Sequence, residues 1–169
     1  MLTATHIVAG CLVGINYARI SGYPEPLAVI IFSAYGSVLP NVDHSTEMFV
    51  RNRLPDGPLK QHLQHRELFH SPLGCGIAWL ICRILFHQIA APINGFFLSA
   101  MVHIFMDLFT YDGIPLFYPN RYRISFAKQD RGSLVEMMIL MPVMFWRIIM
   151  DIQKIPPNIL YNWDGHLFP

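Results

Sequence analysis

His103 and Asp107 stand four residues apart in an apolar stretch that reads Met-Val-His-Ile-Phe-Met-Asp-Leu-Phe-Thr. A spacing of four places both side chains on one face of a helix. Ionisable groups are costly inside an apolar helix and commonly mark functional sites there. Imidazole and carboxylate together suit zinc, manganese or iron. The pair therefore indicates metal ligands. The alternative is a hydrogen-bonded His–Asp pair that joins two helices.

Further histidine and aspartate residues stand near the ends of other apolar runs. They are His6, Asp43, His44, His62, His65 and His70. Three of these histidines fall within nine residues, at 62, 65 and 70. Each residue alone has an ordinary explanation, because Asp and His are frequent at helix ends and histidines are common at membrane interfaces. Together they raise the number of potential metal ligands beyond what one helix supplies.

The composition of the chain is that of a membrane protein. Hydrophobic residues make up 53% of its 169 residues and charged residues only 14%, against roughly a quarter charged in a typical soluble protein. The net charge is +1, and no run of lysine and arginine is dense enough for nucleic-acid binding. Three cysteines without a CxxC pair give neither a disulfide framework nor a thiolate zinc site.

Five apolar stretches organise the chain: residues 2–18, 27–42, 72–91, 93–111 and 134–152. The last three reach the length of about 20 residues that a helix needs to cross a bilayer, and the first two are marginal. The alternation of a membrane β-barrel is absent. We predict an all-α, polytopic membrane helical bundle of four to five transmembrane or re-entrant helices, formed by residues 1–153. Residues 154–169 are predicted to form a C-terminal tail.

Basic residues concentrate in two loops, between the second and third stretches and between the fourth and fifth. They are Arg51, Arg53, Lys60, Arg66, Arg121, Arg123, Lys128 and Arg131. With five spans, both loops share a side with the N-terminus, and the positive-inside rule makes that side cytoplasmic. No basic residue precedes the first apolar run, so we expect no cleaved targeting segment.

This topology gathers the candidate ligands at the cytoplasmic end of the bundle. They are His6, Asp43, His44, His65, His70, His103 and Asp107. A tetrahedral ion uses four ligands, so the set favours a site for two ions, with zinc preferred and manganese or iron as alternatives. Alternatively, His44 and His62 hydrogen-bond to the ligands without touching the ion, or they lie at the membrane interface.

Three segments resemble the YdjM-like family of membrane-bound, metal-dependent hydrolases of the inner membrane. They are residues 39–44 (Leu-Pro-Asn-Val-Asp-His), 65–71 (His-Arg-Glu-Leu-Phe-His-Ser) and 103–110 (His-Ile-Phe-Met-Asp-Leu-Phe-Thr). The family patterns are L-P-D-x-D-H, H-R-x-x-x-H-S and H-x-x-x-D-x-x-T. Residues 113–119 and 132–136 are similar to two later family patterns. The resemblance covers about residues 1–140 and implies a multi-pass inner-membrane protein with a metal site.

The resemblance also implies a reaction, namely metal-assisted hydrolysis at the cytoplasmic membrane surface. The expected substrate is a phosphoester or lipid-like molecule, because such groups lie at headgroup depth. Glu136 is the candidate general base or further ligand. Arg66, with Arg121 and Arg123, is the candidate phosphate-binding group, since guanidinium groups match phosphoryl oxygens. The arginines are alternatively ordinary membrane anchors.

Asn41 departs from the family pattern, which commonly has aspartate at this position. An amide keeps an oxygen ligand but loses the negative charge. We therefore expect the chain to bind one ion instead of two, to bind a different ion, or to have an impaired metal site. Asn41 therefore favours a second hypothesis, a non-enzymatic membrane protein with a structural or sensory metal. Metal or proton transport is a third, and the clustering of the ligands at one end of the bundle argues against it.

Overall fold

The computed structural model describes residues 3–41, 70–111, 113–116, 122–126 and 139–154. These residues form the α-helices α1 (Thr3–Ser21), α2 (Pro26–Gly36), α5 (Pro72–Leu85), α6 (Ala90–Asp107) and α8 (Met141–Ile152), with the 3-10 turn η1 (His87–Ile89) before α6. Within the described part of the chain there is no β-sheet, only one isolated antiparallel bridge between Ile114 and Ile124. The prediction of an all-α fold is confirmed.

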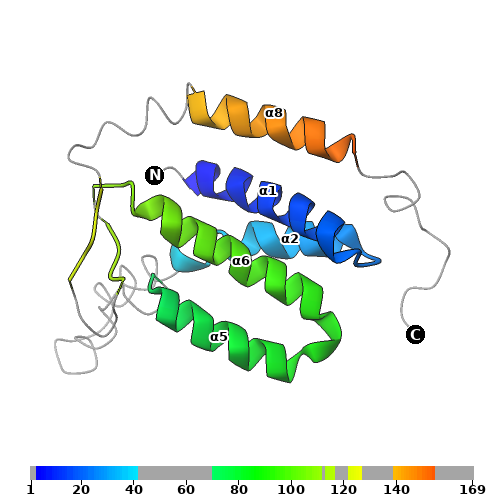
Figure 1. The fold of residues 1–169 in the computed structure, drawn as a ribbon, viewed down its shortest axis with the longest axis horizontal. Helices are drawn as coiled ribbons and strands as arrows, with labels where there is room; N and C mark the ends of the chain where they lie inside the picture. Colours follow the sequence, from blue (N-terminus) through cyan, green and yellow to red (C-terminus); the bar gives the residue numbers. More distant parts are fainter. Residues whose placement is uncertain (1–2, 42–69, 112, 117–121, 127–138, 155–169) are drawn as a thin grey trace, which may run out of the picture.

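The helices alternate in direction, as Figure 1 shows. Helices α1, α2 and α6 pack against one another, α5 packs on α6, and α8 packs on α1. The starts of α1, α5 and α8 therefore lie at the same end of the bundle as the ends of α2 and α6. This is the arrangement that brings His6 near the start of α1 to Asp107 at the end of α6.

Small residues allow the backbones of the central helices to approach closely. A Cβ atom at Gly36 of α2 would lie 1.9 Å from the carbonyl oxygen of Phe96 in α6. In α1, Gly10 and Gly14 are four residues apart and face Ser37 and Ser33, with added Cβ atoms 2.6 and 2.9 Å from the respective serine Cβ atoms. Facing pairs of small residues at this spacing are typical of packed membrane helices.

Helix lengths differ in part from the prediction. Residues 72–91 do not form one long helix, because Phe86 leaves helical geometry with φ −122° and ψ 47° and α5 ends at Leu85 after 14 residues. Among the described residues, one helical segment, His87–Asp107 with 21 residues, is long and apolar enough to cross a membrane; Pro26–Asn41 and Pro72–Leu85 are shorter apolar helices. The described part of the fifth stretch is helical over the 12 residues of α8. A polytopic arrangement stays a prediction.

The outer faces of α5 and α8 are apolar. Leu80 and Ile84 of α5 are 53% and 67% exposed, and Phe145 and Trp146 of α8 are 59% and 66% exposed. Large contiguous apolar surfaces are rare on soluble monomers. Such an exterior is compatible with surrounding lipid and supports the membrane prediction from composition.

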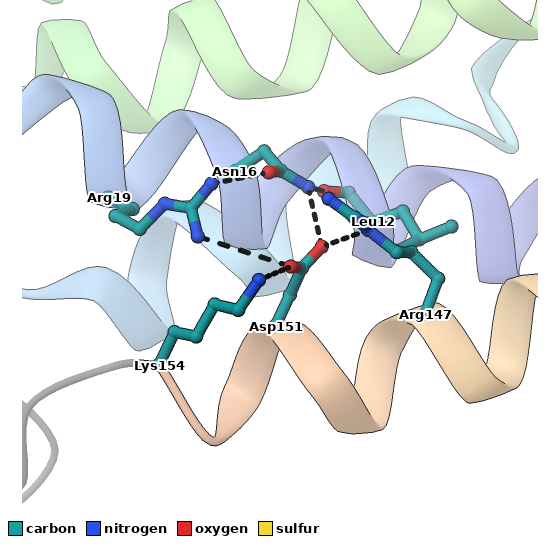
Figure 2. A network of polar contacts seen from close by, with 6 residues as sticks. All are labelled: Leu12, Asn16, Arg19, Arg147, Asp151 and Lys154. Atoms are coloured by element: carbon teal, nitrogen blue, oxygen red, sulfur yellow. Dashed lines mark hydrogen bonds and ion pairs between the residues drawn. The ribbon is translucent and has the colours of Figure 1, made fainter.

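A polar cluster joins the C-terminal ends of α1 and α8, at the opposite end of the bundle from Asp107 (Figure 2). Asp151 is fully covered. Its Oδ2 accepts hydrogen bonds from Arg147 Nε at 2.9 Å and from Asn16 Nδ2 at 3.3 Å. Lys154 and Arg19 lie 3.8 and 4.0 Å from Oδ1. One carboxylate thus bridges three cations, and we name these five residues the α1–α8 latch.

Removing the carboxylate of the latch is expected to loosen α8. In an Asp151→Ala variant, Arg147, Lys154 and Arg19 would repel one another without their shared partner. We expect amide hydrogen exchange in α8 to accelerate by about tenfold, because local opening becomes easier. Glu25→Ala is the matched control, since Glu25 precedes α2 and makes no side-chain cap. Equal exchange rates in the two variants would contradict a role for Asp151 in holding α8.

Candidate metal centre

Four of the predicted ligand residues meet at the end of the bundle where α1 and α5 begin and α6 ends. His6 lies in the first turns of α1, His70 directly precedes α5, and His103 and Asp107 lie on the last turns of α6. His6, His70 and His103 are 2%, 8% and 1% exposed. Three separate segments of the chain therefore contribute buried imidazoles to one place.

Asp107 is the centre of this group. Its Oδ1 lies 3.3 Å from His6 Nε2, and its Oδ2 lies 3.1 Å from His103 Nε2 and 3.9 Å from His70 Nε2. Ligand atoms of His6, His103 and Asp107 all lie within 4.8 Å of one another. Three imidazoles and one carboxylate are a donor set of the size that a tetrahedral ion requires. We name these four residues the His/Asp cluster.

The orientation of His103 is set by a backbone carbonyl. Its Nδ1 lies 2.5 Å from the carbonyl oxygen of Ser37, at the end of α2. A carbonyl oxygen only accepts hydrogen bonds, so Nδ1 carries the proton and, in the neutral ring, Nε2 holds the lone pair. Ligand histidines in metal sites commonly donate their second ring N–H to such a carbonyl.

This tautomer directs a lone pair of His103 Nε2 toward an oxygen of Asp107. The two atoms are 3.1 Å apart, and Nε2 forms no aligned hydrogen bond with any described residue. Two acceptors at this distance repel each other unless a proton or a metal cation lies between them. The position fits a metal ion, whereas an imidazolium that donates to Asp107 would call for an aligned hydrogen bond.

His6 completes the group from the other side. Its ring stacks on that of His103 with centroids 3.7 Å apart and an angle of 20° between the rings. The ring of His70 meets His103 edge to face at 5.9 Å. All three Nε2 atoms also lie within 3.9 Å of a carboxylate oxygen of Asp107, although their rings belong to different segments.

The chain that follows Asp107 is tied back onto the end of α6. Thr110 Oγ1 donates to the carbonyl oxygen of Asp107 at 2.7 Å, and Phe126 N donates to the carbonyl oxygen of Leu108 at 2.8 Å. Gly113 makes the turn with φ +60°, a conformation that L side chains rarely adopt. These bonds hold residues 122–126, including the exposed Arg123, next to the end of α6.

Seven of the residues named for the predicted site lie outside the described residues: Asp43, His44, His62, His65, Arg66, Arg121 and Glu136. Their roles as ligands, general base or phosphate-binding group stay predictions, as does a second ion. Asn41 is described and half-buried; its backbone N–H bonds to the carbonyl oxygen of Val38. Sequence reasoning missed the carbonyl of Ser37, because a backbone group leaves no signal in residue types.

Comparisons with known proteins place the chain in a family. The family model described as "YdjM inner membrane protein" matches residues 1–160. The chain belongs to the YdjM family. Its curated relatives include the inner membrane protein YdjM of Escherichia coli (strain K12) and that of Shigella flexneri. Each is 25% identical over 141 residues, which cover 77% of this chain and 69% of the relative. No solved structure matches the chain.

The family assignment confirms the resemblance drawn from the motifs. It rests on a match that includes all four residues of the His/Asp cluster. The relatives are named as inner membrane proteins, and their names state no reaction. The chemistry has to be inferred from the cluster itself.

Proposed function

We propose that this YdjM-family protein is an inner-membrane hydrolase that uses a divalent metal, preferably zinc, to cleave a phosphoester at the cytoplasmic membrane face. The observation that carries the proposal is the convergence of three imidazoles on Asp107, with His103 turned by Ser37 so that its lone pair faces the carboxylate. Manganese or iron would fit the same nitrogen and oxygen donors.

In this proposal His6, His103 and Asp107 hold the ion, because their ligand atoms lie within 4.8 Å of one another. His70 lies at the edge of the group, with Nε2 3.9 Å from Asp107 Oδ2, and serves as a fourth ligand or moves a proton. Bound there, the metal would polarise the phosphoryl group and acidify a water molecule.

We place the phosphate-binding residues in the basic loops. Arg123 is exposed beside the end of α6, at the end of the bundle where the His/Asp cluster lies, and Arg66 and Arg121 are its proposed partners in binding phosphate. Glu136 is the proposed general base. The proposed setting is a multi-pass protein with a cytoplasmic N-terminus, in contact with membrane lipids and with a phosphoester or lipid-like substrate. A site for two ions would draw its additional ligands from Asp43, His44 and His65.

Asn41 favours a second candidate, a membrane protein whose metal is structural or sensory. The family pattern has a carboxylate where this chain has an amide, so fewer charges are available to hold an ion or activate water. The two candidates differ in coordination. A site closed by four protein ligands indicates structure, whereas an open position indicates catalysis.

Phosphate release from lipid phosphomonoesters and phosphodiesters tests the reaction. We expect the purified chain to release phosphate or a phosphorylated headgroup in detergent, to lose activity with a chelator and to regain it with Zn²⁺. His103→Ala should lower the rate by at least about a hundredfold, because loss of even an outer partner of a metal ligand costs about 10–100-fold.

His87→Ala is the matched control, because His87 is an exposed histidine in η1 at the other end of α6. It should retain the activity of the unmodified chain. Metal-loaded protein that is inert on every phosphoester class would contradict the hydrolase and support the structural or sensory candidate.

A further inference from the structure

A wholly apolar groove runs beside the His/Asp cluster. Its volume is ≈ 480 Å³. Residues of α1, α6 and the start of α8 line it, all of them alanine, valine, leucine, phenylalanine or methionine. Ligand sites commonly have volumes of roughly 300–1,000 Å³.

The groove follows the face of α1 that carries His6 of the cluster. On α1, Ala9 and Val13 line it and follow His6 by three and seven residues, so they lie on the face of α1 that carries His6. On α6, Val102 and Met106 line it, each one residue before His103 or Asp107 and so about 100° around the helix from that residue. A molecule with one end near His6 would therefore extend along the groove on the α1 side.

The α1–α8 latch lies beyond the far end of the groove. Asn16 lies one turn beyond Val13 on α1, and Arg147 and Asp151 lie one and two turns beyond Met144 on α8. From Ala9 to Val13 the groove follows about one turn of α1, roughly 6 Å at 1.5 Å per residue. The His/Asp cluster lies beyond one end of this stretch of α1 and the charged residues of the latch lie beyond the other.

We infer that this groove holds the hydrocarbon chain of the substrate, so that the substrate is a phosphoester of a single long-chain alcohol or lipid. The inference rests on the proposed function and names its substrate class. The lining side chains offer no strong hydrogen-bonding group, so a sugar or a peptide backbone would lose hydrogen bonds there. A hydrocarbon loses none, and Met106 and Met144 can adapt to its shape.

A photoreactive probe tests the groove: decyl phosphate with a diazirine at the end of its chain, added to the purified full chain in a sterol-based detergent. We expect light to attach the probe to peptides of α1 and α8 around Val13 and Met144, and excess unlabelled decyl phosphate to suppress the labelling. Met144→Trp, which fills the groove, should reduce labelling by about tenfold, since overpacking a site excludes its ligand.

Ile149→Trp is the matched control, because Ile149 lies on the same helix and is 41% exposed. The Ile149→Trp variant should take as much label as the unmodified chain. Val102→Phe, which fills the groove from the α6 side, should reduce labelling as Met144→Trp does. Labelling that Met144→Trp and Val102→Phe both leave unchanged, or that maps to the outer face of α5, would overturn the inference.

Metal content, measured on the same samples, separates the two proposals. If the unmodified protein binds metal but takes no label in the groove, the inference that the groove holds a hydrocarbon chain is overturned and the proposed function is not. Protein that takes the label in the groove but binds no metal would overturn the proposed function and leave the hydrocarbon site standing.

Discussion

An Asp107→Ala variant is expected to lose its metal, with bound zinc falling from about one ion per chain to less than about a tenth. Asp107 supplies the only carboxylate of the His/Asp cluster among the described residues, and both of its oxygens face imidazole nitrogens. Removing it leaves His6, His70 and His103 without the negative charge that balances a divalent ion. Metal analysis of the purified variant measures the loss.

Asp151→Ala is the matched control for this variant. Asp151 is also a covered carboxylate among positive groups, but it lies in the latch at the opposite end of the bundle. We expect this variant to keep its metal although α8 loosens. Equal metal content in the two variants would show that the ion is bound elsewhere.

A Gly36→Ala variant is expected to destabilise the bundle by about 1–3 kcal/mol, the usual cost of overpacking a tight interface. Its Cβ would stand 1.9 Å from the carbonyl oxygen of Phe96, a backbone atom that cannot move aside alone. Helices α2 and α6 would have to separate. Because Ser37 follows Gly36, its carbonyl would shift away from His103 Nδ1 and metal affinity should fall as well.

Gly76→Ala is the matched control, because a Cβ at Gly76 of α5 would meet nothing within 4 Å. In a helix interior this change should stabilise the fold by about 0.5–1 kcal/mol. Reversible unfolding in mixed detergent micelles measures both variants. A Gly36→Ala protein as stable as the unmodified chain would contradict the close contact between α2 and α6.

The spacing of His103 and Asp107 predicted their common helix face, and the alternation of apolar stretches predicted which end of the bundle would receive His6 and His70. These features follow from helix geometry and the sequence order of the elements, so they can be read from residues. The end of α5 at Leu85 could not be predicted, because Phe86 and His87 carry no helix-breaking side chain.

The contribution of Ser37 to the site was also beyond sequence reasoning. Its carbonyl reaches His103 only because Gly36 permits close contact between α2 and α6. In the sequence, nothing distinguishes Asp151 from other charged residues near a helix end at the membrane interface. Its role in the latch depends on Asn16, which lies 135 residues away in the chain.

X-ray absorption at the zinc edge tests the central claim most directly, on the purified chain loaded with one equivalent of Zn²⁺. We expect four nitrogen or oxygen ligands at about 2.0–2.1 Å, with the outer-shell scattering of two or three imidazoles and no sulfur. That imidazole signal should vanish in Asp107→Ala. A spectrum of hydrated zinc without imidazole scattering, or one dominated by sulfur, would contradict the metal centre.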